Sequence, residues 1–356
     1  MNVLLEPVVE KVRKAAERGW PLRIRGGGSK DFYGQRLHGE LLDLRPLAGI
    51  VSYEPSELVV TVRAGTRLRE LETVLAEAGQ CLPFEPPRFG QAGTVGGAVA
   101  AGLSGPARPS AGALRDYVLG AQLVNGRGQV LSFGGQVMKN VAGYDVSRLL
   151  AGAMGTLGVI AEVSLKVLPV APAEATLLFE LSETSARQQL NRWCGQPLPL
   201  NASCWQDGQL MVRLRGAQAA VAAARKLMGG ALLEPEAAAR QWHALRDQSS
   251  PFFRLAPGEA LWRVSVPDTA TPLNLGPTVI EWHGAQRWVR LTPADAPLVR
   301  EAAARAGGHA TLFRGGDGQV PVFTPLAPAL ARIHAELKRE FDPAGIFCPG
   351  RMALDY

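Results

Sequence analysis

Three glycine-dense segments contain the residues whose type and spacing most clearly indicate chemistry. They cover residues 25–30 (Arg-Gly-Gly-Gly-Ser-Lys), 93–105 and 139–160. Glycine lets the backbone adopt positive φ and approach a ligand without an intervening Cβ. Consecutive N–H groups in such turns attract phosphate oxygens. Three segments of this kind within the first 160 residues therefore predict one long, phosphate-bearing ligand that several loops touch.

The spacing of these glycines argues against two common phosphate-binding motifs. The sequence has no Gly-x-x-x-x-Gly-Lys-Ser/Thr, so a P-loop is not supported. No Gly-x-Gly-x-x-Gly opens a helix ahead of a suitably placed acidic residue, so the Rossmann signature is also missing. One glycine run alone would more often mark a turn, but three in this order favour a ligand site.

The composition is that of an ordinary globular protein. Hydrophobic residues make up 47% and charged residues 20% of 356 positions, and this length predicts two domains. The net charge is +6, but the basic residues are scattered. Because no Lys/Arg run or aromatic-interleaved basic stripe occurs, we expect no nucleic-acid partner.

The cysteines indicate neither a metal site nor a disulfide framework. Cys81, Cys194, Cys204 and Cys348 form no Cys-x-x-Cys pair, so we expect no iron–sulfur cluster, no structural zinc and no other metal. Their number in so long a chain fits a reducing compartment. Residues 1–17 lack the apolar core of a signal peptide, and no 18-residue stretch is apolar enough to span a bilayer. The prediction is a cytoplasmic protein.

Local patterns predict the elements that must position the glycine segments. Residues 21–25 alternate like a strand that delivers the first segment, and Thr94 can cap a short helix in the second. The apolar runs 117–124 and 129–133 predict a hairpin across Asn-Gly-Arg-Gly, and residues 159–167 a closing strand. This order indicates an α+β arrangement and not a doubly wound sheet.

The character of the chain changes near residues 169–172, where we place a domain boundary. Beyond it, strands are expected at 176–181, 200–205 and 209–214, and an alanine-rich helix at 218–228. The pattern favours an antiparallel sheet backed by helices on one face. A last helix is expected at 326–341.

Residues 87–169 resemble the FAD-binding domain of the vanillyl-alcohol oxidase (PCMH-type) flavoprotein superfamily. Within it, the chain resembles the E-type subunits of bacterial glycolate oxidases, from the first glycine segment to residues 341–352 (Phe-Asp-Pro-Ala-Gly-Ile-Phe-Cys-Pro-Gly-Arg-Met). The fold class implied is α+β, a PCMH-type two-subdomain FAD-binding domain plus an antiparallel α+β cap domain. The implied domains are 1–170 for FAD, 171–319 for the cap or substrate, and 320–356 returning to the FAD domain.

The resemblance also implies the cofactor and its residues. Covalent members often carry a histidine after the first glycine run, where Ser29 and Lys30 stand here, so we expect non-covalent FAD. The pyrophosphate is assigned to the first two segments, the adenosine and flavin to Arg115, Asp116 and the third. The cofactor-binding residues expected are Arg25, Gly26, Gly27, Gly28, Ser29, Lys30, Gly93, Thr94, Val95, Gly96, Gly97, Ser104, Gly105, Arg115, Asp116, Lys139, Asn140, Gly143, Tyr144, Gly152, Gly155, Thr156, Gly158, Val159 and Ile160. No catalytic residue is assigned.

The implied activity is the oxidation of glycolate, a small 2-hydroxy acid, to glyoxylate. The implied partners are a larger FAD-linked subunit and an iron–sulfur subunit that takes the electrons, with the membrane reached only through them. His243, His283 and His309 are isolated, unlike the histidine-rich cap cluster of the family's 2-hydroxy-acid dehydrogenases. This favours a supporting or electron-relay role. A self-sufficient FAD-dependent dehydrogenase acting on D-lactate or a similar acid stays open, as does an assembly subunit with little catalysis of its own.

The arginines of the second half offer one more candidate for chemistry. Arg263, Arg287, Arg290 and Arg314 could hold a substrate carboxylate through two parallel hydrogen bonds. Surface positions and ordinary ion pairs are the more common roles for such residues.

Overall fold

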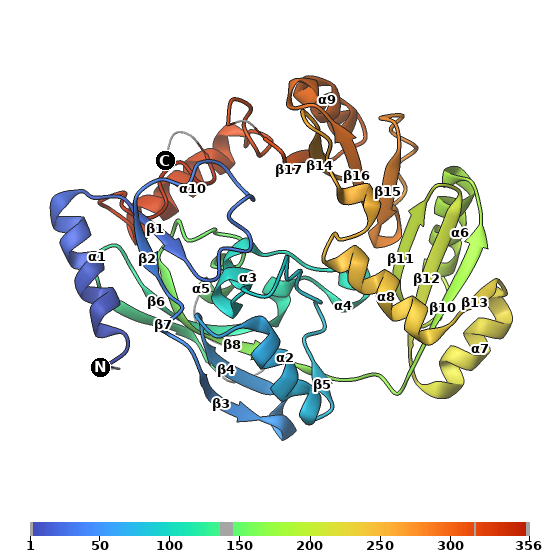
Figure 1. The fold of residues 1–356 in the computed structure, drawn as a ribbon, viewed down its shortest axis with the longest axis horizontal. Helices are drawn as coiled ribbons and strands as arrows, with labels where there is room; N and C mark the ends of the chain where they lie inside the picture. The colour runs from blue at the N-terminus through green and yellow to red at the C-terminus, as the bar shows by residue number, and fades with distance from the viewer. Residues whose placement is uncertain (1–2, 136–144, 317, 354–356) are drawn as a thin grey trace. The chain divides into compact units, whose positions relative to one another are not determined.

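The computed structural model describes residues 3–135, 145–316 and 318–353 (Figure 1). The chain divides into two compact units. Unit 1 comprises Met1–Leu103, Ala113–Pro169 and Pro325–Tyr356, and unit 2 comprises Ser104–Gly112 and Val170–Thr324.

Unit 1 begins with a helix packed beside a parallel pair of strands. Helix α1 (Glu6–Arg18) carries buried Val8, Val9, Val12 and Ala15 at helical spacing and ends at Gly19, whose φ of 65° suits glycine. Strand β1 (Leu22–Arg25) pairs in parallel with β2 (Glu40–Asp43). On its other side, Leu22 forms a bridge with Phe347 near the C-terminus. Strand β1, which leads into the first glycine segment, is therefore held by β2 on one side and by the chain near the C-terminus on the other.

The larger sheet of unit 1 is antiparallel and five-stranded, in the order β3-β4-β8-β6-β7. Leu71 and Leu75 of α2 are fully buried, and they belong to one core with Val62 and Val163 of the sheet. The predicted hairpin of residues 117–124 and 129–133 is β6 paired with β7. The remaining elements of unit 1 are β3 (Ile50–Glu54), β4 (Val59–Arg63), α2 (Leu68–Glu77), β5 (Gln80–Cys81), α3 (Val95–Ala101), β6 (Val118–Val124), β7 (Val130–Gly134), α5 (Val146–Leu149), β8 (Val159–Lys166), β9 (Leu168–Pro169) and α10 (Pro328–Phe341).

Unit 2 is built on an eight-stranded sheet in the order β13-β10-β12-β11-β15-β16-β14-β17. All of its strand pairs are antiparallel. The elements are α4 (Arg108–Ala111), β10 (Ala173–Glu180), α6 (Glu183–Cys194), β11 (Leu200–Gln206), β12 (Gln209–Gly216), α7 (Gln218–Met228), β13 (Ala231–Leu233), α8 (Pro235–Arg246), β14 (Ala260–Ser265), β15 (Thr278–Glu281), β16 (Gln286–Leu291), α9 (Ala296–Arg305) and β17 (His309–Arg314).

Helices cover both faces of the sheet in unit 2, so the expectation of helices on one face was wrong. Leu177 of β10 belongs to one core with α6 and α7. The next residue back, Thr176, accepts a hydrogen bond from Nε1 of Trp242 on α8 at 3.0 Å. Because neighbouring residues of a strand point to opposite faces, α8 lies on the face away from α6 and α7. The hydrophobic pattern of α8 shows that one side is buried but not which face of the sheet receives it.

The segment Ser104–Gly112 belongs to unit 2, which differs from the single domain expected over residues 1–170. Nε1 of Trp282 donates to the carbonyl oxygen of Gly105 at 3.1 Å. The guanidinium of Arg108 lies 4.4 Å from the centroid of the Trp282 ring. Trp282, about 175 positions further along the chain, thus holds this segment in unit 2. No local pattern in the segment predicts that contact.

Candidate cofactor-binding groove

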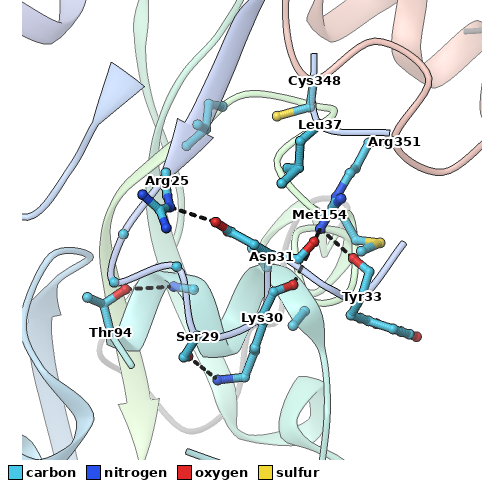
Figure 2. A pocket seen from close by; sticks show the side chains of 17 residues that line it. Arg25, Ser29, Lys30, Asp31, Tyr33, Leu37, Thr94, Met154, Cys348 and Arg351 are labelled. Atoms are coloured by element: carbon cyan, nitrogen blue, oxygen red, sulfur yellow. Dashed lines mark hydrogen bonds and ion pairs between the residues drawn. The ribbon is translucent and has the colours of Figure 1, made fainter. Parts of the chain in front are cut away.

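Two adjoining cavities in unit 1 share six lining residues and form what we call the glycine groove. The shared residues are Ile24, Gly26, Thr94, Gly97, Ala100 and Met154. The first cavity adds the loop after β1 and two residues near the C-terminus (Figure 2). The second adds Leu44, Ala64 and the end of the third glycine segment. All three predicted segments therefore contribute to one concave surface.

The first glycine segment packs so closely against the second that side chains are excluded. A Cβ on Gly26 would lie 2.2 Å from Oγ1 of Thr94, and a Cβ on Gly27 would lie 1.4 Å from the carbonyl oxygen of Ala92. Gly28 has a φ of +72°, which glycine adopts without strain. Gly26 and Gly27 are required by this close packing, and the same bare backbone lines the groove.

In the second segment, Thr94 caps the short helix α3 as predicted. Its hydroxyl accepts a hydrogen bond from the backbone N–H of Gly97 at 3.2 Å (Figure 2). A Cβ on Gly96 would lie 2.5 Å from Cβ of Ala64, so Gly96 is fixed by packing against the end of β4. A Cβ on Gly97 would meet only Oγ1 of Thr94, at 3.1 Å. Of these two glycines, Gly97 is therefore the better probe of a ligand.

The third segment closes the second cavity. Gly155 and Gly158 both have positive φ, of 77° and 150°, and line this cavity together with Ile160. The backbone N–H of Met154 donates to the carbonyl of Ala100 at 2.8 Å, which ties the turn to α3. The groove is thus lined by the first segment, by α3 and by this turn.

The charges around the groove favour an anionic ligand. Its lining residues include the cations Arg25, Lys30 and Arg351 and the single carboxylate Asp31. Arg25 and Asp31 form an ion pair of 2.7 Å (Figure 2). Since cations outnumber the carboxylate, the local field attracts negative charge. A pyrophosphate fits this balance.

Two groove residues, Cys348 and Arg351, come from the C-terminal segment and were not predicted as site residues. Arg351 is buried, and burial lowers its pKa. Its guanidinium donates to the carbonyl oxygens of Gln35 at 2.9 Å and Asp31 at 3.1 Å, and also to that of Tyr33. Burial raises the pKa of the Cys348 thiol, which therefore stays protonated at neutral pH. The one available signal was their place within the family-like stretch 341–352.

About half of the predicted cofactor residues line the glycine groove. They are Arg25, Gly26, Gly27, Gly28, Ser29, Lys30, Thr94, Gly96, Gly97, Gly155, Gly158 and Ile160. Five others lie within two positions of a lining residue in the chain, namely Gly93, Val95, Gly152, Thr156 and Val159. Val95 and Val159 are core residues. The hydroxyl of Thr156 is buried and donates to the carbonyl of Ala153 at 2.7 Å.

The other predicted residues are not among those that line the groove. Arg115 and Asp116 are exposed, and Oδ2 of Asp116 accepts a hydrogen bond from the N–H of Ala113 at 2.8 Å. Ser104 and Gly105 belong to unit 2. Four lie outside the described residues, namely Lys139, Asn140, Gly143 and Tyr144.

Of the three histidines and four candidate arginines in unit 2, His283 and Arg287 are buried. Nδ1 of His283 lies 2.9 Å from Oγ of Ser203, and burial lowers the pKa of His283 to about 4. Arg287 is buried, and it donates to the carbonyls of Ala270, Thr271 and Gly284. It is thus committed to the backbone, neither at the surface nor poised for a substrate carboxylate.

Two features are absent from the described part of the chain. Within it, no helix has both the length and the apolar character needed to cross a membrane. Nor do the residues in that part include a group of three or more His, Cys, Asp or Glu side chains that could hold a metal ion.

Comparison with solved structures agrees with this fold. The chain aligns with structures of alkyldihydroxyacetonephosphate synthase at TM-scores of 0.66 and 0.68. These alignments cover 97% of this chain and 74% and 75% of the synthase chains, at 16% and 17% sequence identity. The likeness shows the fold alone, the α+β architecture described above.

Sequence comparison places the chain more narrowly. Residues 5–134 match the FAD binding domain family. Glycolate oxidase subunit GlcD of Bacillus subtilis is 31% identical over 49% of this chain and 37% of its own length. Glycolate oxidase subunit GlcE of Escherichia coli is 47% identical over 98% of this chain and 97% of its own length. The chain with the glycine groove is therefore an FAD-binding oxidoreductase of the GlcE family of glycolate oxidase subunits.

Proposed function

We propose that this chain is the FAD-binding subunit of a complex that oxidises glycolate to glyoxylate. A larger FAD-linked subunit and an iron–sulfur subunit would complete the complex, and the iron–sulfur subunit would take the electrons. The observation that carries the proposal is the likeness to a GlcE subunit over nearly the whole of both chains. We further propose that the complex works in the cytoplasm and reaches the inner membrane only through its other subunits.

The glycine groove supports the assignment of FAD. We assign the pyrophosphate to the bare backbone of Gly26, Gly27 and Gly28, with Lys30 and Arg351 offsetting its charge. The second cavity, with Gly155, Gly158 and Ile160, would take a planar ring against an apolar wall of Leu44 and Ala64. The bound flavin supplies the capacity to accept a hydride. The chain's own part is to bind, orient and shield the cofactor.

We propose that the chain supports or relays electrons rather than starting the oxidation itself. A residue that takes the hydroxyl proton of glycolate needs a pKa near the working pH. Burial holds the pKa of His283 near 4, and both Ser203 and Ser110 lie within hydrogen-bonding distance of its ring nitrogens. His283 is therefore poorly suited to act as the base.

One observation favours a second function, that of a self-sufficient 2-hydroxy-acid dehydrogenase. D-lactate dehydrogenase of Anaerostipes hadrus is 31% identical over 40% of this chain. That match covers only 29% of the dehydrogenase, so it weighs less than the match to GlcE. Dye reduction by the isolated chain with glycolate and with D-lactate tests both readings. Turnover by the chain alone supports the second function, and turnover only with the partner subunits supports the first.

The cofactor assignment is tested by Gly97→Val, because its side chain would enter the groove while its Cβ meets only Thr94. We expect the flavin content per chain to fall at least tenfold, with little change in the melting temperature. Gly195→Val is the matched control, since Gly195 has a negative φ and its nearest neighbour atom would lie 3.6 Å from an added Cβ. Wild-type flavin content in Gly97→Val would contradict the assignment of the groove.

A further inference from the structure

Lys338 is the buried residue of the amphipathic helix α10, although lysine is almost never fully buried without a partner. Its side chain is 8% exposed. Nζ donates three hydrogen bonds, to the carbonyl oxygens of Thr156 and Phe347, each at 2.8 Å, and to Oδ2 of Asp342 at 2.6 Å. An ammonium has three donors, so the described contacts use all of them.

Asp342 completes this arrangement from the end of the same helix. Its side chain is fully buried. Besides Lys338, its carboxylate accepts the backbone N–H of Ile346 at 3.1 Å and that of Phe347 at 2.7 Å. The carboxylate therefore fixes the fold of the chain after α10. Residues 342–351 are hereafter the C-terminal strap.

The C-terminal strap lies along β1 and reaches the groove. The N–H of Leu22 donates to the carbonyl of Ile346 at 2.6 Å, and the N–H of Cys348 donates to the carbonyl of Leu22 at 2.8 Å. Beyond this pairing, Cys348 and Arg351 line the first cavity (Figure 2). Arg351 also bonds the carbonyls of the loop that follows the first glycine segment. The strap is thus part of one wall of the groove.

Lys338 connects the strap to the turn that closes the second cavity. Thr156, whose carbonyl it holds, sits between Gly155 and Gly158 in the turn that closes the second cavity. Phe347, whose carbonyl it also holds, directly precedes Cys348. One ammonium therefore bonds both the strap and the turn. An apolar side chain of similar length would remove this donor from both carbonyls and leave the buried carboxylate with two backbone N–H partners but no cation.

We propose that Lys338 and Asp342 are positioning residues for the cofactor, acting through the C-terminal strap and the turn at residues 155–158. The inference rests on the proposed function, in that the groove must hold FAD. A merely structural pair would lower stability and leave the affinity of the folded protein for FAD unchanged. A positioning pair changes the affinity and the environment of the bound flavin in a protein that is still folded.

The test uses the full chain, stripped of flavin and titrated with FAD, with affinity followed by fluorescence and the flavin environment by visible circular dichroism. For Lys338→Met we expect at least a tenfold loss of affinity and an altered dichroism spectrum. Glu340→Gln is the control on the same helix, because it removes only an exposed ion pair with Arg127. It should bind FAD like the wild type. Equal affinity and equal spectra for Lys338→Met and wild type would overturn the inference.

A milder variant covers the case in which Lys338→Met does not fold. Asp342→Asn keeps one oxygen acceptor and removes the charge, and we expect a threefold to tenfold loss of affinity. Wild-type affinity in Asp342→Asn would then overturn the inference. A wild-type chain that binds no FAD would overturn both the proposed function and this inference, whereas tight wild-type binding with unaffected variants would overturn only the latter.

Discussion

The two units of the molecule fix their important surfaces by opposite means. In unit 1 the glycine groove is formed by backbone from which side chains are missing, as at Gly26 and Gly27. In unit 2, by contrast, polar side chains such as His283 and Arg287 occupy buried positions. Missing side chains leave room for a ligand, whereas buried polar groups consume their hydrogen bonds within the protein. Unit 1 also buries polar side chains, Lys338 and Asp342 among them, but its groove is lined in large part by bare backbone.

The sheet of unit 2 illustrates the second case. Glu281 accepts hydrogen bonds from Nε1 of Trp288 at 2.5 Å and Nε2 of Gln286 at 3.0 Å, and all three residues are buried. Such networks stabilise one arrangement because any unpaired member would be costly. A change in either unit can alter FAD binding, stability or both, and these effects distinguish the two units.

The largest effect is expected for Gly27→Ala in unit 1. Its Cβ would lie 1.4 Å from the carbonyl oxygen of Ala92, so backbone must move. We expect a loss of about 3 kcal/mol or more in the free energy of unfolding of unit 1, together with loss of bound flavin. Urea unfolding and flavin absorbance measure both.

The control for this change is Gly79→Ala, where φ is +66° but no atom lies within 4 Å of the added Cβ. It should cost about 1 kcal/mol through backbone strain alone and leave flavin content unchanged. Flavin loss in this control as well would show that flavin binding is sensitive to glycine changes anywhere in unit 1. The effect of Gly27→Ala would then say nothing specific about the groove.

Arg287→Met should destabilise unit 2 by about 3 kcal/mol without changing FAD affinity. The substitution leaves the carbonyls of Ala270 and Thr271 and the carboxylate of Glu183, 3.6 Å from the guanidinium, without their partner. Urea unfolding followed by tryptophan fluorescence measures the stability, and FAD titration the affinity. A tenfold loss of FAD affinity at a temperature where the variant is folded would contradict the separation of roles.

The stability of unit 2 should fall with acid because of His283. Burial lowers the pKa of this residue to about 4 in the folded protein, opposed by the charge of Asp268, against an ordinary value of 6.5. The folded state holds the neutral form, so its contribution is complete above about pH 6.5 and is lost as the pH falls toward 4. Between pH 7 and 5 we expect a loss of about 2 kcal/mol from this residue.

The measurement compares urea unfolding of the wild type and His283→Gln at both pH values. The wild type should lose about 2 kcal/mol more than the variant over this range. An equal change of stability with pH in both proteins would show that His283 has the same pKa in the folded and the unfolded state.

The smallest effect is expected for Asp116→Ala. Its carboxylate accepts the N–H of Ala113, a capping interaction worth about 1 kcal/mol. Unchanged FAD affinity would assign Asp116 to local structure alone. A tenfold loss of affinity would instead support the adenosine contact that the family resemblance implies for it.

The sequence by itself determined the elements and the glycine loops, because both depend on local rules. Strand β1, the hairpin of β6 and β7 and helix α7 follow from periodicity and turn residues, and each lies within a few residues of its predicted position. The pairing of β1 with β2 and the short strands β5 and β9 were missed, because their partners are far away in the chain.

Only the tertiary structure decided which distant residues complete the glycine groove and which buried side chains use their hydrogen bonds within the protein. Arg351 reaches the groove across more than 300 residues, and Arg287 is committed to backbone carbonyls that no spacing rule connects to it. Local propensity acts over a few residues, whereas a buried charge is placed by whichever acceptors the folded chain brings within hydrogen-bonding distance. Those acceptors exist only once the fold has formed.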